Sequence, residues 1–229
     1  MRNRKKILSQ SLLIDWQKIE NFIGYGPINA PVVFVGIEEG ASRDRDKLEN
    51  ELLARSNAPA LAELNCPDFK TIKTWRVMCD FMLRREGQVN TDRDSRLHYQ
   101  RNRLGKSSDD SLLTELLPYP SPGLDVWPYN ELGRDANRET YLRRILPGRV
   151  ELLKTVIASH RRECVICYGK GYAPLFKQLF PAALVWQRIN TFELAKLDGQ
   201  IIAIVPHFAG RSFNSESQMA DFYRFMAAS

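Results

Sequence analysis

Two hydrophobic patterns alternate along the chain. Apolar residues recur at helical spacing in some segments, and short runs rich in β-branched residues stand between them. The helical spacing predicts helices at residues 7–24, 68–86, 140–162 and 216–228, with an interruption near Pro147 in the third. The β-branched runs predict strands at residues 31–35 and 111–117 and two or three strands in residues 183–207. Residues 163–181 are predicted to form a strand, a glycine turn and a helix. Strands that alternate with helices are typical of a mainly parallel sheet with helices on both faces.

The expected fold is a three-layer α/β/α sandwich whose mainly parallel central sheet has about four strands. At 229 residues, 44% of them hydrophobic, the chain can bury a core of ordinary size. We therefore expect a single domain over residues 1–229, with a basic polar insertion around residues 84–110.

The ends of four predicted strands carry glycine, proline or polar residues. They are residues 36–40, Thr114 and Glu115 with the prolines that follow, residues 169–171, and Pro206, His207 and Phe208. Because ligands bind beyond the carboxyl ends of parallel strands, we expect these ends to converge on one polar mouth. The turn at Gly169 and Gly171 could hold a phosphate, but it lacks the spacing of a phosphate-binding loop, and a tight strand-to-helix turn is the simpler interpretation.

The first of these strand ends places two carboxylates side by side. The stretch PVVFVGIEEG, residues 31–40, runs from a buried apolar strand into Glu38 and Glu39, which Gly36 and Gly40 bracket. At the end of a central strand, backbone amides can face a ligand and both carboxylates can take part in chemistry. Alternatively, one glutamate caps a helix N-terminus, where the helix dipole favours a carboxylate.

Charge gives the first indication of a partner. The formal net charge is +6, and residues 84–106 hold seven Lys or Arg against three Asp or Glu. Such a segment could neutralise phosphates, with Tyr99 and the arginines stacking on bases. The alternative is a solvated loop on a mildly basic protein.

Composition also predicts a cytoplasmic protein. The longest apolar runs fall far short of the roughly 20 residues of a membrane span, and the basic start lacks the apolar core and cleavage site of a secretory signal. We expect a monomer with no membrane partner, no metal and no cofactor. Cys164 and Cys167 should face opposite sides of a strand, which argues against a CxxC metal site. The alternative is an iron–sulfur site that uses all four cysteines, Cys66 and Cys79 included.

Taken together, four motifs resemble those of the uracil-DNA glycosylase superfamily. They are VVFVGIEEG, LLTELLPYPSPG, CVICYGKGYAPLF and IAIVPHFAGRSFN, and they follow the family's order over residues 30–225. The resemblance implies the family's fold and an enzyme that removes a base from DNA during base-excision repair. The partner would be nucleic acid, most simply DNA.

The resemblance also assigns roles to individual residues. Glu38 stands where the family positions the water that attacks the sugar, and Glu39 replaces the usual proline. His207 matches the histidine that hydrogen-bonds the departing base, a role that suits a neutral imidazole. In the loop that follows, Phe208, Arg211 and Phe213 could wedge into the base stack, or they could be core and surface residues.

Glu115 departs from the family pattern in an informative way. Family members commonly place an asparagine there to read the edge of uracil, whereas an ionised glutamate only accepts hydrogen bonds. It would suit amino groups such as cytosine N4 or adenine N6, and it would repel a carbonyl of uracil unless burial protonated it. Alternatively, Glu115 faces solvent or pairs with an arginine.

Three functions follow from these features. The first is a DNA glycosylase-like hydrolase that cleaves the N-glycosidic bond of a flipped damaged or modified base, and that base need not be uracil. The second is a nucleic-acid-binding relative that has lost the chemistry, because the key motifs deviate. The third is an enzyme that acts on free nucleosides or nucleotides.

Overall fold

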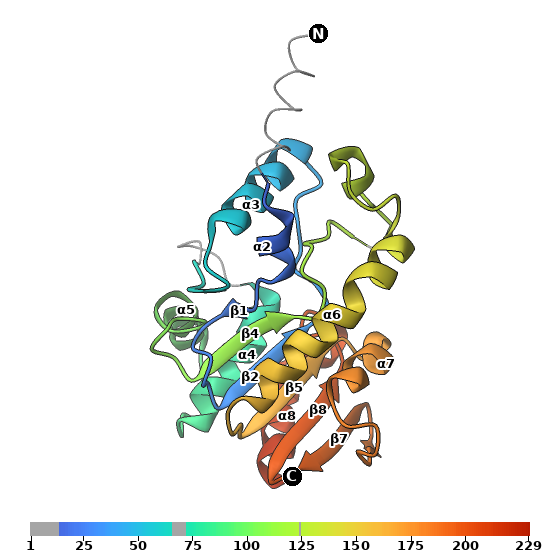
Figure 1. Ribbon diagram of the computed structural model, residues 1–229. Coiled ribbons are helices and arrows are strands. Elements are labelled where there is room, and N and C mark those ends of the chain that lie inside the picture. The colour runs from blue at the N-terminus through green and yellow to red at the C-terminus, as the bar shows by residue number, and fades with distance from the viewer. Residues whose placement is uncertain (1–13, 66–71, 124) are drawn as a thin grey trace.

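The computed structural model describes residues 14–65, 72–123 and 125–229, which form a mixed α/β fold around one sheet (Figure 1). Within these residues the sheet has eight strands in the order β3–β1–β4–β2–β5–β8–β7–β6. Their bounds are β1 Gly24–Tyr25, β2 Val32–Gly36, β3 Leu61–Ala62, β4 Ser111–Glu115, β5 Cys164–Tyr168, β6 Gln187–Ile189, β7 Phe192–Leu197 and β8 Gln200–Val205.

The four central strands, β4, β2, β5 and β8, are parallel to one another. The prediction of a mainly parallel sheet is therefore confirmed, but the predicted number of about four strands is smaller than the eight observed. The additional strands flank this centre: β1 is antiparallel to β4 and parallel to β3, while β7 and β6 add antiparallel strands beside β8. β1 and β3 have only two residues each, too few to show an alternating pattern.

Helices cover both faces of the sheet. On one face, a hydrophobic core lies between the sheet and helices α2 (Trp16–Glu20), α3 (Arg45–Asn57), α6 (Arg138–Ala158) and α7 (Ala173–Phe176). On the opposite face, a second core lies between the sheet and helices α4 (Lys73–Arg85), α5 (Arg93–Asn102) and α8 (Glu216–Ala228). Successive residues of β2 alternate between the cores and are all buried, which explains its continuous apolar run. No helix in the described parts of the chain is long and apolar enough to cross a membrane.

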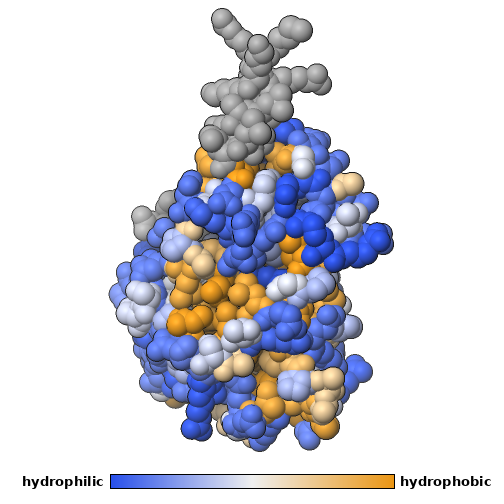
Figure 2. All heavy atoms as spheres, viewed as in Figure 1, coloured by the Kyte–Doolittle hydropathy of each residue, from blue (hydrophilic) through white to orange (hydrophobic). Residues whose placement is uncertain are grey.

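Four short 3₁₀ helices complete the described structure: η1 Tyr129–Leu132, η2 Lys170–Tyr172, η3 Lys177–Leu179 and η4 Arg211–Phe213. Most of the surface in the view of Figure 1 is polar, and apolar side chains gather over the region of β1 and β4 (Figure 2). The predicted tight turn at Gly169 is present. Gly169 has a φ of 125°, a conformation that favours glycine, and η2 begins at the next residue.

The predicted break of the long helix at Pro147 is wrong. α6 continues through Pro147 from Arg138 to Ala158. Proline removes one hydrogen bond to the carbonyl four residues earlier, here that of Arg143. Pro147 and Arg143 are both exposed, so water can satisfy that carbonyl and the helix need not end.

The cysteine pattern behaves as expected where it is described. Cys164 packs in the core that contains α4 and α8, whereas Cys167 packs in the core that contains α6. The two thiols therefore face opposite sides of the sheet, which rules out a shared metal site for this pair. Cys66 lies outside the described residues, as do residues 7–13 of the first predicted helix.

The basic segment is not a solvated loop, which was the alternative to a phosphate-binding segment. Helix α5 occupies residues 93–102 and begins with a capping box between Asp92 and Ser95. The ion pairs of this segment join Arg84 to Asp80, Arg85 to Asp110 and Glu163, Arg96 to Asp80 and Glu216, and Arg103 to Glu86 and Asp109. Tyr99 is buried and donates a 2.6 Å hydrogen bond to Asp109, so stacking of Tyr99 on a base is contradicted.

The loop after β8 also differs from expectation. Phe208 and Phe213 are 1% and 0% exposed and belong to the core beneath α8, so their wedge role is contradicted. Phe208 stacks on Tyr168, with ring centroids 4.7 Å apart and planes 13° from parallel. Arg211 is exposed, but it does not line the cavity described below. The apolar residues of this loop serve packing.

Core burial predicts a large stability loss on truncation of these rings. Phe208→Ala or Phe213→Ala should lower the free energy of unfolding by about 3–5 kcal/mol, because each leaves a cavity in the core. Arg211→Ala, in the same loop, should stay within about 0.5 kcal/mol of wild type. Urea denaturation measures all three. Phenylalanine variants as stable as Arg211→Ala would show that the rings are not core residues.

Candidate active site

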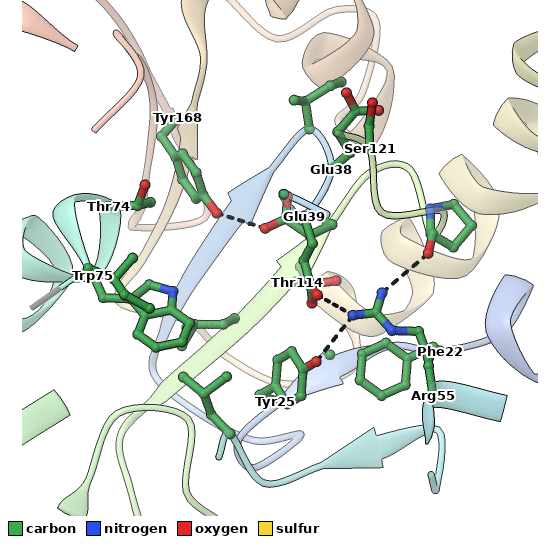
Figure 3. Close-up of a pocket in the computed structure, with 18 of the residues that line it drawn as sticks. Phe22, Tyr25, Glu38, Glu39, Arg55, Thr74, Trp75, Thr114, Ser121 and Tyr168 are labelled. Atoms are coloured by element: carbon green, nitrogen blue, oxygen red, sulfur yellow. Dashed lines mark hydrogen bonds and ion pairs between the residues drawn. The ribbon is translucent and has the colours of Figure 1, made fainter. Parts of the chain in front are cut away.

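A cavity of about 670 Å³ opens at the carboxyl ends of all four central strands (Figure 3). β2 leads into Glu38, Glu39 and Gly40. Glu115 ends β4, Tyr168 ends β5, and His207 follows β8. The predicted convergence of the strand ends is therefore confirmed, except that Tyr168 lines the cavity at the end of β5 whereas residues 169–171 do not. Phe22, Tyr25 and Trp75 add aromatic side chains to the wall.

Glu115 and Tyr168 meet across Gly36. Tyr168 donates a hydrogen bond from its hydroxyl to Oε1 of Glu115 at 2.8 Å. β2 lies between β4 and β5, and Gly36 is in register with Glu115. A Cβ at Gly36 would overlap both the Glu115 carboxyl group and the Tyr168 hydroxyl, so the contact requires glycine at this position.

The Glu115 carboxyl group is neutral near pH 7. Burial raises its pKa to about 8, and the nearby Glu39 carboxylate raises it further, against the opposing effects of Tyr168 and Arg55. Its Oε2 is buried and has no hydrogen-bond partner in the structure. The side chain thus neither faces solvent nor pairs with an arginine, which excludes both alternatives considered from the sequence.

Arg149 binds the backbone carbonyl of Glu115 and not its carboxyl group. Arg149 of α6 donates to the carbonyl oxygen of Glu115 from Nε at 3.2 Å and from Nη2 at 2.7 Å, and to that of Phe22 at 2.6 Å. Burial lowers the pKa of Arg149 to about 10, so the guanidinium keeps its charge at neutral pH. It fixes the end of β4 at the cavity.

Glu39 lies inside the cavity and pairs with Arg55 of α3. Arg55 also donates to the hydroxyl of Tyr25 at 3.2 Å and to the carbonyl oxygen of Pro118 at 3.3 Å (Figure 3). Its guanidinium lies 4.9 Å from the ring centroid of Phe22, within range of a cation–π contact. These contacts hold a carboxylate against an aromatic wall.

Glu38 points in another direction. Arg138 donates to its Oε2 at 2.6 Å, and in Figure 3 the side chain lies beside Ser121, apart from Glu39. Burial raises the pKa of Glu38, while Arg138 opposes the shift. Neither glutamate caps the helix that follows, because the N-cap of α3 is Asp44, so the capping alternative is wrong.

His207 presents a neutral imidazole to the cavity. Its Nδ1 accepts a 3.2 Å hydrogen bond from the N–H of Ala209, which leaves the ring proton on Nε2. Burial lowers the pKa of His207 below its ordinary value of 6.5, so the ring is uncharged at pH 7. The Nε2–H is available to donate to a ligand.

The structure brings together five of the residues chosen from the sequence and leaves out three. Glu38, Glu39, Gly40, Glu115 and His207 line the cavity, and Gly36 lies under the Glu115 carboxyl group. Phe208, Arg211 and Phe213 do not line it. Sequence reasoning missed the arginine partners Arg55, Arg138 and Arg149, since partners so distant along the chain leave no spacing signal.

No protein-family model matches this sequence, and no curated protein matches it. The resemblance of its motifs to uracil-DNA glycosylases therefore stays a prediction.

The raised pKa of Glu115 predicts a pH-dependent stability. The unfolded chain ionises this carboxyl near pH 4.5 and the folded protein only near pH 8, so the stability it contributes is present below pH 4.5 and lost as the pH rises to 8. Glu115→Gln lacks this titration. Over that range, wild type should lose about 3–5 kcal/mol relative to the variant in urea denaturation.

Glu151→Gln, which alters an exposed glutamate on α6, is the matched control and should follow the wild-type curve. Parallel pH profiles for wild type and Glu115→Gln would show that Glu115 titrates normally.

Proposed function

We propose that this protein is a DNA glycosylase-like hydrolase that cleaves the N-glycosidic bond of a flipped damaged or modified base. The observation that carries the proposal is the cavity itself. It combines the carboxylate of Glu39, the second carboxyl group of Glu38 and the neutral imidazole of His207, at the strand ends where the motifs resemble the glycosylase superfamily.

The size and walls of the cavity support a base as the ligand. Its volume of about 670 Å³ is within the ordinary range for small-molecule sites. Tyr25 and Trp75 offer aromatic faces on which a planar ring can stack. Glu115 and His207 can then hydrogen-bond the edge of that ring.

The chemistry needs only these side chains and water. As the bond from the sugar carbon to the base nitrogen breaks, its electron pair leaves with the base and positive charge develops on the sugar. Glu39 stabilises that charge, and Glu38 orients the water whose oxygen forms the new bond to the sugar carbon. His207 donates a hydrogen bond to an acceptor atom of the departing base. The proton that the water releases passes through the Glu38 carboxylate to the base.

Two observations favour a second candidate, an enzyme that acts on free nucleosides or nucleotides. The phenylalanines of the loop after β8 are buried, so they cannot act as a wedge in duplex DNA without leaving the core. Several arginines of the basic segment are engaged in ion pairs, which weakens the case for a phosphate-binding surface there. Neither observation affects the chemistry of the cavity.

A base-release assay tests both candidates. The substrates are single- and double-stranded DNA with uracil, hypoxanthine, xanthine or modified cytosines, and the corresponding free nucleosides. Wild type should release a base, and Glu38→Gln, Glu39→Gln and His207→Gln should each slow release by about 10²-fold or more. Glu151→Gln, outside the cavity, should retain the wild-type rate.

The substrate that reacts separates the candidates. Release from DNA but not from nucleosides supports the glycosylase, whereas release from nucleosides alone supports the second candidate. No release from any substrate, together with salt-sensitive DNA binding, contradicts both and indicates a binding relative without catalysis.

A further inference from the structure

One end of the sheet exposes the edge of a strand. β6 is the last strand in the order, beyond the strand labelled β7 in Figure 1, and among the described strands it pairs only with β7. All three residues of β6 are exposed. The outer main-chain groups of β6 therefore face no described strand, and an edge of this kind can pair with a further strand.

The same edge carries exposed apolar side chains. In the described parts of the chain, the exposed large hydrophobic residues are Val89, Val185 and Ile189, with exposed fractions of 74%, 77% and 38%. Ile189 ends β6, and Val185 lies just before the strand begins. In an extended chain these two side chains share one face, with Gln187 midway between them. A pair of exposed apolar residues beside an open strand edge indicates an interaction surface.

The sequence of this edge is complementary to itself when two copies run antiparallel. With a two-fold axis at Gln187, Val185 of one copy lies opposite Ile189 of the other. In the same register, Trp186 lies opposite Arg188. Each pair forms twice, as a two-fold interface requires. Apolar side chains then cover one another and a guanidinium lies beside an indole ring, which are favourable cross-strand pairs.

The neighbouring registers are less favourable. A two-fold axis at Arg188 places the two guanidinium groups opposite each other and sets Val185 opposite Thr191. Like charges that lie directly opposite destabilise a pair of strands. A two-fold axis at Trp186 sets Val185 opposite Gln187, so the apolar side chains again do not meet. Charge and hydropathy therefore select the register centred on Gln187.

We propose that this edge is a self-association surface, at which two copies of the chain pair β6 antiparallel about Gln187 and continue the sheet from one copy into the other. The partner is a second copy of this chain, in contrast to the monomer expected from the sequence. Residues 185–189 offer less than the roughly 1,200 Å² buried in a standard interface, so we expect a weak dimer with a dissociation constant of about 10 µM to 1 mM. No residue of β6 lines the cavity, so this inference is independent of the proposed function.

Sedimentation equilibrium over that concentration range tests the dimer and its register. Wild type should pass from monomer to dimer. The double variant Val185→Lys with Ile189→Lys puts like charges opposite each other, whereas Val185→Lys with Ile189→Glu puts opposite charges there. The second variant should associate at least about tenfold more tightly than the first, although both replace the same two apolar residues. Val89→Lys, which alters an exposed apolar residue outside the edge, should match wild type.

Cysteine cross-linking tests the position of the two-fold axis directly. In the proposed register, Gln187→Cys places one thiol opposite its copy, at a separation that a disulfide can span with little adjustment. Mild oxidation should therefore link the two copies. Arg188→Cys offsets the two thiols by two residues along the strands, so it should give little cross-linked dimer. Wild type oxidised in parallel accounts for the cysteines that the chain already has.

Three results would overturn the inference. They are a wild-type protein that stays monomeric over the whole range, equal association of the two charge variants, or faster cross-linking of Arg188→Cys than of Gln187→Cys. The substituted side chains are all exposed, so each variant should keep the wild-type circular dichroism spectrum and Tm. A dimer without base release would contradict the proposed function alone, whereas base release by a strict monomer would contradict only this inference.

Discussion

The hydrogen bond from Tyr168 to Glu115, across Gly36, is the interaction on which the cavity depends. It links the ends of β4 and β5 over the strand between them, and it can form only because the central position has no side chain. The tyrosine ring is held in turn by stacking on Phe208. The packing of the core and the chemistry of the cavity thus meet at Tyr168.

Three glutamates share this cavity because their charges are compensated in different ways. Glu39 and Glu38 are each compensated by a different arginine, Arg55 and Arg138. No third guanidinium binds the carboxyl group of Glu115, so the least costly state for this buried group is neutral. Three residues of one type therefore have different charges and different roles, which their identity alone does not reveal.

Much of the framework could be predicted from hydrophobic patterning. The runs that became β2, β4, β5 and β8 are apolar because both faces of the sheet are covered, and strand ends in parallel sheets converge by topology. Glu38, Glu39, Glu115 and His207 could be placed near one another on this ground alone.

The remaining features depend on contacts between distant parts of the chain. In helix α3, which carries Arg55, two of the four buried residues are the polar Glu49 and Ser56, so its apolar pattern is weak. Phe208 and Phe213 follow a strand end like the site residues, but the packing of α8 buries them. The state of Glu115 depends on burial and on Glu39, which local sequence does not encode.

A direct titration of Glu115 shows whether the cavity holds a neutral carboxyl group. Carbon-13 NMR of protein labelled at the glutamate side chains would follow each carboxyl signal with pH, and Glu115→Gln would identify the signal of residue 115. We expect this signal to titrate near pH 8. A Glu115 signal that titrates near 4.5, like an ordinary glutamate, would contradict it.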